Sequence, residues 1–168
     1  SVVDSSGQAA LLAPTEVLAQ QHFRTIKKLL GELAQAGTLQ AASIGTEVEL
    51  LTGSLSNAEK KEIHAKLASG QTGIVIGTHA LISDGVTFAD LGLVVVDEQH
   101  RFGVEQRDAL RMKAKQPPHL LVMTATPIPR TVAMTVFGDL DISTLKELPS
   151  GRVAITTHII PVLEKPHF

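Results

Sequence analysis

The sequence predicts an α/β fold built on a mostly parallel β-sheet. Short aliphatic runs, which have the length of buried strands, alternate along the 168 residues with longer segments of helical periodicity. Such alternation is typical of β-α-β units, in which each helix returns the chain to the same end of the sheet. Hydrophobic residues make up 43% of the chain and charged residues 19%, a balance that predicts a globular core and excludes a disordered chain.

Five strands are expected, and the aliphatic content of each favours burial. They cover Ala9–Ala13, Val48–Leu51, Gly73–Ile76, Leu91–Val96 and Leu120–Met123. The fourth is the most apolar, which favours a central position with both faces covered. A further alternating run, Val153–Ile160, follows a linker that contains Pro and Gly, and is expected to belong to another domain.

Three helices are expected between these strands. Thr15 is a good N-cap for the first, whose apolar residues recur at helical spacing and are Phe23, Ile26, Leu30 and Leu33. Ser56 and Glu59 form an S-x-x-E capping box that opens the second, and Gly70 is expected to end it. The third, a polar helix, is expected over Val104–Lys115, before the helix-breaking pair Pro117-Pro118.

Composition and charge exclude several classes of protein. The chain has no cysteine, so disulfides, thiolate nucleophiles and zinc sites built on cysteine are excluded, and a reducing, cytoplasmic location is expected. Its longest aliphatic runs are too short to span a membrane, and its first residues lack the pattern of a secretory leader. A formal net charge of −2 and an aromatic content of 3% predict neither a broad cationic surface nor a stacking platform for single strands. Any contact with nucleic acid is therefore expected to be local, from loops and helix ends.

Polar residues follow two of the expected strands where a nucleotide would bind. Asp97 and Glu98 end the most apolar strand, and open α/β sheets bind ligands at the carboxyl ends of their strands. A carboxylate at Asp97 is suited to hold Mg²⁺ through water, and one at Glu98 to deprotonate an attacking water molecule. The same pattern also occurs as an acidic strand end that binds nothing. Thr124, Ala125 and Thr126 close the next strand, where hydroxyl groups can contact a γ-phosphate or can simply cap a helix.

Five short motifs occur in the order and at the spacing found in superfamily 2 helicases. They resemble motif Ia, the Gly motif and motifs Ib, II and III of that superfamily, and are Pro14-Thr15-Glu16, Thr52-Gly53-Ser54, Gly77-Thr78-His79, Asp97-Glu98-Gln99-His100 and Thr124-Ala125-Thr126. Three longer strings, Asp97–Val104, Thr124–Thr131 and Gly138–Thr144, resemble the RecG-like branch of ATP-dependent DNA helicases. Translocases of the Mfd transcription-repair coupling type are similar and stay an alternative.

The resemblance implies a RecA-like fold of the P-loop NTPase type, with three layers and a mostly parallel sheet. ATP and Mg²⁺ are the implied cofactors, and DNA in branched junctions and forks is the implied partner. The residues implied in catalysis are Asp97, Glu98 and His100, with Mg²⁺ on Asp97, and those implied in coupling hydrolysis to movement are Thr124, Ala125 and Thr126. The residues implied in contacts with DNA are Pro14, Thr15, Glu16, Gly53, Ser54, Thr78, His79, Arg101 and Phe102. Ordinary turn, cap and packing chemistry is the competing interpretation of these residues.

The chain departs from the family in one respect that concerns ATP binding. It contains no G-x-x-x-x-G-K-[ST] sequence, because none of its thirteen glycines is followed by lysine. Residues 1–148 are therefore expected to form an N-terminally truncated first motor domain without its Walker A strand and loop. Residues 149–168 are expected to form a linker and the first strand of a second motor domain.

Two properties of such a fragment are expected. By itself it is catalytically inactive, and the strand Leu120–Met123 exposes an apolar edge through which copies of the chain self-associate. The parent protein is expected to act on forks and Holliday junctions in recombination and repair, in the cytoplasm at the nucleoid. A non-hydrolysing module that binds nucleic acid or a protein partner is the alternative from another class.

Overall fold

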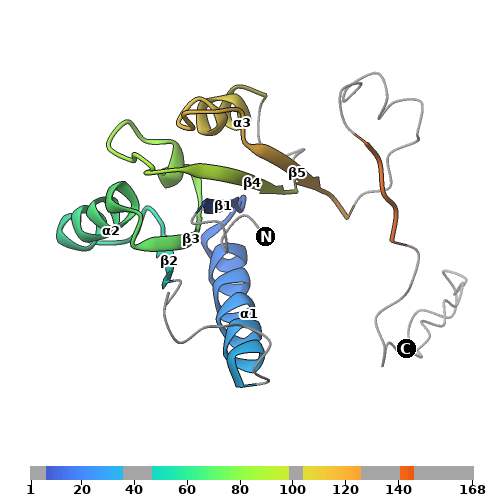
Figure 1. Ribbon diagram of the computed structural model, residues 1–168, viewed down its shortest axis with the longest axis horizontal. Coiled ribbons are helices and arrows are strands. Elements are labelled where there is room, and N and C mark those ends of the chain that lie inside the picture. The colour runs from blue at the N-terminus through green and yellow to red at the C-terminus, as the bar shows by residue number, and fades with distance from the viewer. Residues whose placement is uncertain (1–6, 36–46, 99–103, 126–140, 146–168) are drawn as a thin grey trace, which may run out of the picture. The chain divides into compact units, whose positions relative to one another are not determined.

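The computed structural model describes residues 7–35, 47–98, 104–125 and 141–145. Within these ranges the chain forms five strands, three α-helices and one 3₁₀ helix (Figure 1). The strands are β1 (Gln8–Leu12), β2 (Glu47–Leu51), β3 (Thr72–Gly77), β4 (Leu91–Asp97) and β5 (His119–Met123). The helices are α1 (Glu16–Gln35), α2 (Asn57–Ser69), η1 (His79–Ile82) and α3 (Val104–Arg111).

All five expected strands are confirmed, and so are the first two helices, but the third helix is shorter than expected. It ends at Arg111 rather than at Lys115. The amides of Lys113 and Ala114 bond to the carbonyl oxygens three residues earlier, at 3.2 and 3.1 Å, and this tighter pattern turns the chain out of the α-helix. The expected strand over Val153–Ile160 lies outside the described residues.

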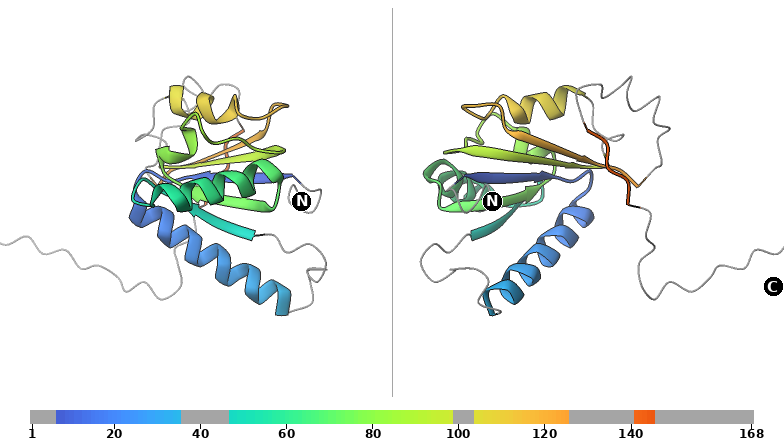
Figure 2. Two further views of the ribbon diagram at one scale, coloured as in Figure 1. Left: turned by 90° about the vertical axis from the view of Figure 1, so that its left-hand side faces the viewer. Right: turned by 45° about the vertical axis from the view of Figure 1, so that its right-hand side comes forward.

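The five strands are all parallel and lie in the order β2-β3-β1-β4-β5. Helix α1 covers one face of the sheet, while α2, η1 and α3 contribute buried side chains to the other (Figure 2). These layers confirm the expected α/β class and the three-layer arrangement. The most apolar strand, β4, lies inside the sheet between β1 and β5, as its composition predicts.

The core consists of two apolar clusters, one on each face of the sheet. Successive residues of β1 belong to different clusters, because side chains alternate along a strand. The cluster on the α1 face comprises Leu11, Ala13, Ala19, Val48 and Ile76, with Phe23, Ile26 and Leu30 of α1 packed against it. The opposite cluster includes Leu12, Leu51, Val75 and Val94 of the strands and Leu67, Leu81 and Leu110 of the helices.

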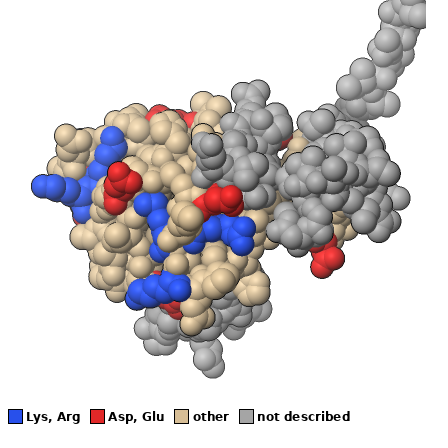
Figure 3. All heavy atoms as spheres, turned by 90° about the horizontal axis from the view of Figure 1, so that it is seen from above, with Lys and Arg blue, Asp and Glu red and all other residues tan. Residues whose placement is uncertain are grey.

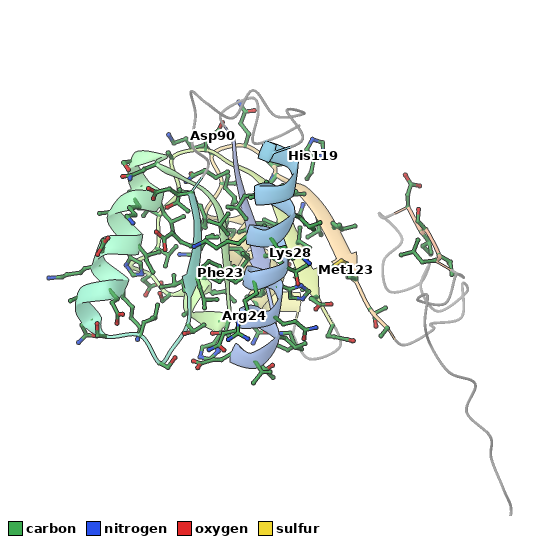
Figure 4. All side chains as sticks on the ribbon, turned by 90° about the horizontal axis from the view of Figure 1, so that it is seen from below. Phe23, Arg24, Lys28, Asp90, His119 and Met123 are labelled. Atoms are coloured by element: carbon green, nitrogen blue, oxygen red, sulfur yellow. The ribbon has the colours of Figure 1, made fainter. Side chains whose placement is uncertain are left out.

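A buried glutamine ties the N-terminal ends of the central strands together. The Gln8 side chain donates to the carbonyl oxygens of Leu67 and Thr72 at 3.0 and 2.7 Å. Its own amide oxygen accepts from the backbone N–H of Asp90 at 3.0 Å. Figure 4 shows Asp90 and His119 at this end of the sheet, opposite the end where the predicted functional residues lie. Gln8 is only 1% exposed, so its three hydrogen bonds compensate the burial of a polar group.

The chain divides into two compact units, Ser1–Pro127 and Ile128–Phe168. The described part of the second unit, residues 141–145, has no regular secondary structure. The expected domain boundary between Leu148 and Pro149 lies outside the described residues. No helix in the described ranges is long and apolar enough to cross a membrane.

Candidate functional site

The predicted functional residues converge on the edge where the parallel strands end. Each of the five strands is followed, or ended, by residues of one predicted motif. These are Gly53 and Ser54 after β2, Thr78 and His79 after β3, Pro14, Thr15 and Glu16 after β1, Asp97 and Glu98 at the end of β4, and Thr124 and Ala125 after β5. The strand order divides this edge into two parts. Of the residues that the structure describes, those expected to contact DNA lie on the β2-β3-β1 side and those expected to contact nucleotide on the β4-β5 side, with the boundary between β1 and β4.

Asp97 and Glu98 lie at the end of β4, on the side expected to contact nucleotide. The Asp97 side chain is 16% exposed, and its Oδ2 lies 2.7 Å from Nε2 of His22 on α1. Glu98 is partly buried and has a φ of 49°, the one positive φ among the described residues other than glycine. A left-handed backbone costs a residue with a Cβ about 1–2 kcal/mol, and such strain tends to accumulate at functional positions.

The end of β5 lies directly beside this pair. Asp97 is opposite Met123 in the β4–β5 ladder, so Thr124 and Ala125 follow immediately at the same edge. Both residues are exposed. His100 and Thr126, which were predicted to complete this side, lie outside the described residues.

This side of the edge provides one ligand suited to Mg²⁺. The described residues contain no group of three or more His, Asp or Glu side chains that could enclose a metal ion. Mg²⁺ does not require such a cage, because it commonly keeps several waters and binds to one or two carboxylates and to phosphate oxygens of the substrate. Asp97, partly buried at the end of a strand, fits that kind of binding, and Mg²⁺ is usual for a nucleotide-hydrolysing motor.

Gly77 and Thr78 join the ends of β1, β2 and β3. The carbonyl oxygen of Gly77 accepts from the N–H of Ala13 at 2.8 Å, and the N–H of Thr78 donates to the carbonyl of Leu51 at 3.3 Å. A Cβ at position 77 would overlap the Leu51 carbonyl oxygen, so the close approach of β2 and β3 requires glycine. The Thr78 side chain is 2% exposed, which leaves His79 as the motif Ib candidate with an exposed side chain.

Motif Ia and the Gly motif are joined by a carboxylate. Oε1 of Glu16 accepts from the backbone N–H of Ser54 at 3.0 Å, although the two residues are 38 positions apart. Oγ1 of Thr15 accepts from the N–H of Leu18 at 3.3 Å, which confirms Thr15 as a cap of α1. The carbonyl oxygen of Gly53 accepts from Nζ of Lys60 at 2.7 Å. Lys60 of α2 therefore holds this loop.

The residues predicted to contact DNA also differ in how exposed they are to solvent. Thr15, Gly53, Ser54 and His79 are exposed, whereas Pro14 and Glu16 are partly buried. Arg101 and Phe102 lie outside the described residues. On the face seen in Figure 3, Lys and Arg side chains are interspersed with Asp and Glu, in keeping with the net charge of −2. With a net charge of −2, any contact of these groups with DNA is expected to depend on local amides and hydroxyls rather than on a broad positive field.

The contacts made by two residues of the site, His22 and Glu16, were not predicted from the sequence. His22 lies two helical turns after Thr15, and nothing in its local pattern indicates a partner 75 residues away. Glu16 carries a carboxylate in a loop assigned to phosphate binding, and a negative charge would repel a phosphate. That conflict was the one available indication that Glu16 bonds within the protein.

The chain resembles known helicases at the level of sequence. A family model described as DEAD/DEAH box helicase matches residues 2–135. The ATP-dependent DNA helicase RecG of Mycobacterium tuberculosis is 63% identical over 167 residues, which cover 98% of this chain and 23% of the relative. RecG of Synechocystis is 52% identical over 159 residues, which cover 95% of this chain and 18% of the relative. The chain thus spans a quarter or less of the length of these relatives.

Solved structures give the same picture. A RecG structure bound to a three-way DNA junction matches with a TM-score of 0.70 and 37% identity, over 96% of this chain and 20% of that one. A DEAD box protein from Methanococcus jannaschii shares the fold, with a TM-score of 0.54 and 17% identity over 77% of this chain. The expected resemblance to RecG-like helicases is therefore confirmed. Because the family model covers most of its residues, the chain belongs to the DEAD/DEAH box helicase family.

Proposed function

We propose that this chain is part of the motor of an ATP-dependent DNA helicase that remodels branched DNA, such as forks and Holliday junctions. The observation that carries the proposal is the convergence of five motif-bearing strand ends on one edge, in a chain 63% identical to RecG over nearly its whole length. Relatives that are between 46% and 63% identical to this chain are RecG helicases, which favours the RecG-like branch over the Mfd-type alternative.

On the nucleotide side, the two carboxylates have different tasks. Asp97 holds Mg²⁺ through water, and Glu98 accepts a proton from the water that attacks the γ-phosphate. Bound Mg²⁺ would neutralise charge on the phosphate groups during phosphoryl transfer. Thr124 and Thr126 follow the neighbouring strand, and their hydroxyls would respond to the loss of the γ-phosphate and couple hydrolysis to movement. His100 would act beside them as a hydrogen-bonding relay.

On the DNA side, the exposed strand ends contact the phosphate backbone. Thr15, Gly53, Ser54 and His79 offer hydroxyl, imidazole and backbone N–H groups there. Such groups bind phosphates without reading the base sequence. Arg101 and Phe102 would extend this contact from the segment after β4. Glu16 and Thr78 serve in our proposal as supports of these loops, because one bonds to the Ser54 amide and the other is buried.

The chain alone is expected to have no ATPase activity. Its sequence lacks the phosphate-binding G-x-x-x-x-G-K-[ST] loop, so the amides and lysine that hold the phosphates are not provided by these residues. ATP hydrolysis by the purified 168-residue chain that disappears in the Glu98→Gln variant would contradict this expectation.

The proposal is tested by ATP hydrolysis of the full-length parent protein on branched DNA. We expect Glu98→Gln to lower turnover by about 100-fold or more, because the general base is removed, while DNA binding is retained. Glu62→Gln is the matched control, since Glu62 is an exposed carboxylate on α2 away from the edge. Unchanged turnover in Glu98→Gln would mean that Asp97 and Glu98 are only a strand end, whereas no turnover in the wild-type protein would favour the non-hydrolysing binding module.

A further inference from the structure

His22 lies where the two sides of the edge meet. It belongs to α1, the helix that begins at the DNA side with Thr15 and Glu16, yet its Nε2 lies 2.7 Å from Oδ2 of Asp97 on the nucleotide side. Both side chains are partly buried, with exposed fractions of 28% and 16%. Figure 4 shows Arg24, two positions after His22, toward the end of the sheet opposite Asp90 and His119.

The chemistry of the pair defines the direction of the hydrogen bond. An ionised carboxylate can only accept hydrogen bonds, so in this pair Nε2–H of His22 is the donor and Oδ2 of Asp97 is the acceptor. This bond restrains one oxygen of Asp97 and the rotation of the carboxylate, and leaves the other oxygen for a water of the Mg²⁺ shell. Carboxylates that serve metal ions are commonly oriented by a second hydrogen bond of this kind.

The backbone of α1 connects this bond to the DNA side. Thr15 caps the helix and Glu16 holds the Ser54 amide, while Ala19 is fully buried against the sheet. From Thr15 to His22 the helix rises about 10 Å, at 1.5 Å per residue. Any displacement of the first turn of α1 by a DNA phosphate is therefore transmitted along a rigid element to the side chain that restrains Asp97.

We propose that His22 is the positioning residue of Asp97, and that it ties Mg²⁺ binding to the position of the DNA-facing helix α1. The inference rests on the proposed function, because it assigns Asp97 to Mg²⁺. His22 has no contact with nucleotide in this scheme. It acts only through the orientation of the Asp97 carboxylate.

The test measures Mg²⁺-dependent nucleotide binding by the full-length protein. Fluorescent N-methylanthraniloyl-ADP is titrated with MgCl₂, with and without branched DNA, and again in EDTA. His22→Leu removes the donor at similar bulk, whereas His22→Gln keeps an N–H at the ε position. Gln21→Leu is the matched control, an exposed side chain one position earlier on the same helix. Thermal unfolding of each variant reports any general loss of structure.

We expect His22→Leu to raise the half-saturating Mg²⁺ concentration by about 10-fold, at the lower end for loss of an outer-shell ligand partner. Affinity for the ADP probe in EDTA should not change, and His22→Gln should move the Mg²⁺ requirement back toward wild type. DNA should shift the Mg²⁺ requirement in wild type and in Gln21→Leu, and this shift should disappear in His22→Leu. A merely structural role would instead lower the unfolding temperature and weaken ADP binding in EDTA as well.

The outcomes separate this inference from the proposed function. Wild-type binding of the ADP probe that does not depend on Mg²⁺ would overturn both this inference and the proposed function. If ADP binding by wild type depends on Mg²⁺ but His22→Leu has the same half-saturating Mg²⁺ concentration, the role of His22 alone is overturned. The same holds if His22→Gln is folded and its Mg²⁺ requirement is raised as much as that of His22→Leu. If branched DNA does not shift the Mg²⁺ requirement of wild type, the proposed effect of the position of α1 on Mg²⁺ binding is overturned.

Discussion

Gly77 shows how a single residue adjusts the functional edge. It ends β3 against the carbonyl of Leu51 on β2, and its own carbonyl receives the amide of Ala13 as β1 ends. Three strand ends thus meet at one residue without a side chain. Gly31 is the contrasting case, since it is exposed in the interior of α1 and a Cβ there would meet no atom within 4 Å. Gly77 is thus required by the close approach of β3 to β2, whereas no contact of Gly31 requires glycine.

Alanine substitutions at these two glycines should have opposite effects. Gly77→Ala should lower the free energy of unfolding by about 3 kcal/mol, because the new methyl group must push backbone apart in a packed region. Gly31→Ala should raise it by about 0.5–1 kcal/mol through helix propensity. Urea denaturation of the chain followed by circular dichroism measures both. Equal stabilities of the two variants would contradict the close approach of β2 and β3.

Helix α2 carries its own start and stop signals and is anchored to the sheet by charge. The capping box between Ser56 and Glu59 is fully formed, and Gly70 ends the helix with a φ of 81°. Nζ of Lys66 lies 2.9 Å from Oε1 of Glu49 on β2, and the hydrogen bonds that Lys66 donates to Glu49 and Glu62 raise its pKa well above the usual value. The helix also supplies Lys60, which holds the Gly53 loop. The stability of α2 therefore bears on the position of a proposed DNA contact.

Loss of the cap should destabilise this element measurably. Oγ of Ser56 accepts from the amide of Glu59, while Oε2 of Glu59 accepts from the amide of Ser56 at 2.8 Å. Ser56→Ala should lower the free energy of unfolding by about 1 kcal/mol, because one amide of the first turn loses its acceptor. Urea denaturation is again the measurement. Substitution of the exposed neighbour Asn57 by Ala is the control and should leave stability nearly unchanged.

The capping box between Ser56 and Glu59 also predicts that the free energy of unfolding depends on pH. The hydrogen bonds from the Ser56 side chain and backbone hold the pKa of Glu59 below its ordinary value. The stabilisation is therefore present above the ordinary glutamate pKa of about 4.3 and is lost as the pH falls through the lower pKa of the folded state. Between pH 5 and pH 3, wild type should lose more stability than Glu59→Gln, whose side chain does not titrate. Parallel losses in the two proteins would contradict the assignment.

At the scale of the whole sheet, the two edges differ in chemistry. The β2 edge carries Glu47 and Glu49, with Lys66 beside them, and charged side chains of this kind discourage edge-to-edge pairing. The β5 edge is apolar, and Leu121 on it is 50% exposed. Figure 4 shows Met123 of β5 beyond α1, on a part of this face that the helix does not cover. The position of β5 at the edge beside β4 agrees with the expectation from the sequence.

The β5 edge pairs with no further strand among the described residues, and it should cause the isolated chain to self-associate. We expect multi-angle light scattering to show an apparent mass that rises with concentration, because an apolar strand with an unpaired edge can pair with another copy. Leu121→Lys should reduce this association strongly. Val17→Lys on α1, where Val17 is 75% exposed, is the control for added surface charge. A wild-type chain that stays monomeric at high concentration would contradict the prediction.

Much of the fold could be predicted because its signals are local. The period of the apolar residues, the Thr15 cap, the capping box and Gly70 depend on neighbours within one or two helical turns. The placement of Asp97 and Glu98 at a strand end followed from the aliphatic run before them. The end of α3 was missed because it depends on tertiary contacts as well as on local pattern: Nζ of Lys113 donates to the carbonyls of Ser83 and Val86 at 2.8 and 2.9 Å.

The α/β class, the order of the elements and the kinship with helicases could be inferred from the sequence alone, since each depends on residue types at short spacing. The three-dimensional structure was needed to establish the full strand order, and with it the division of the edge into two sides. It brought Glu16 to Ser54 and His22 to Asp97, across 38 and 75 residues of chain. Parallel strands are joined by long crossovers, so the partners of a side chain at the edge depend on strand order and not on distance along the sequence.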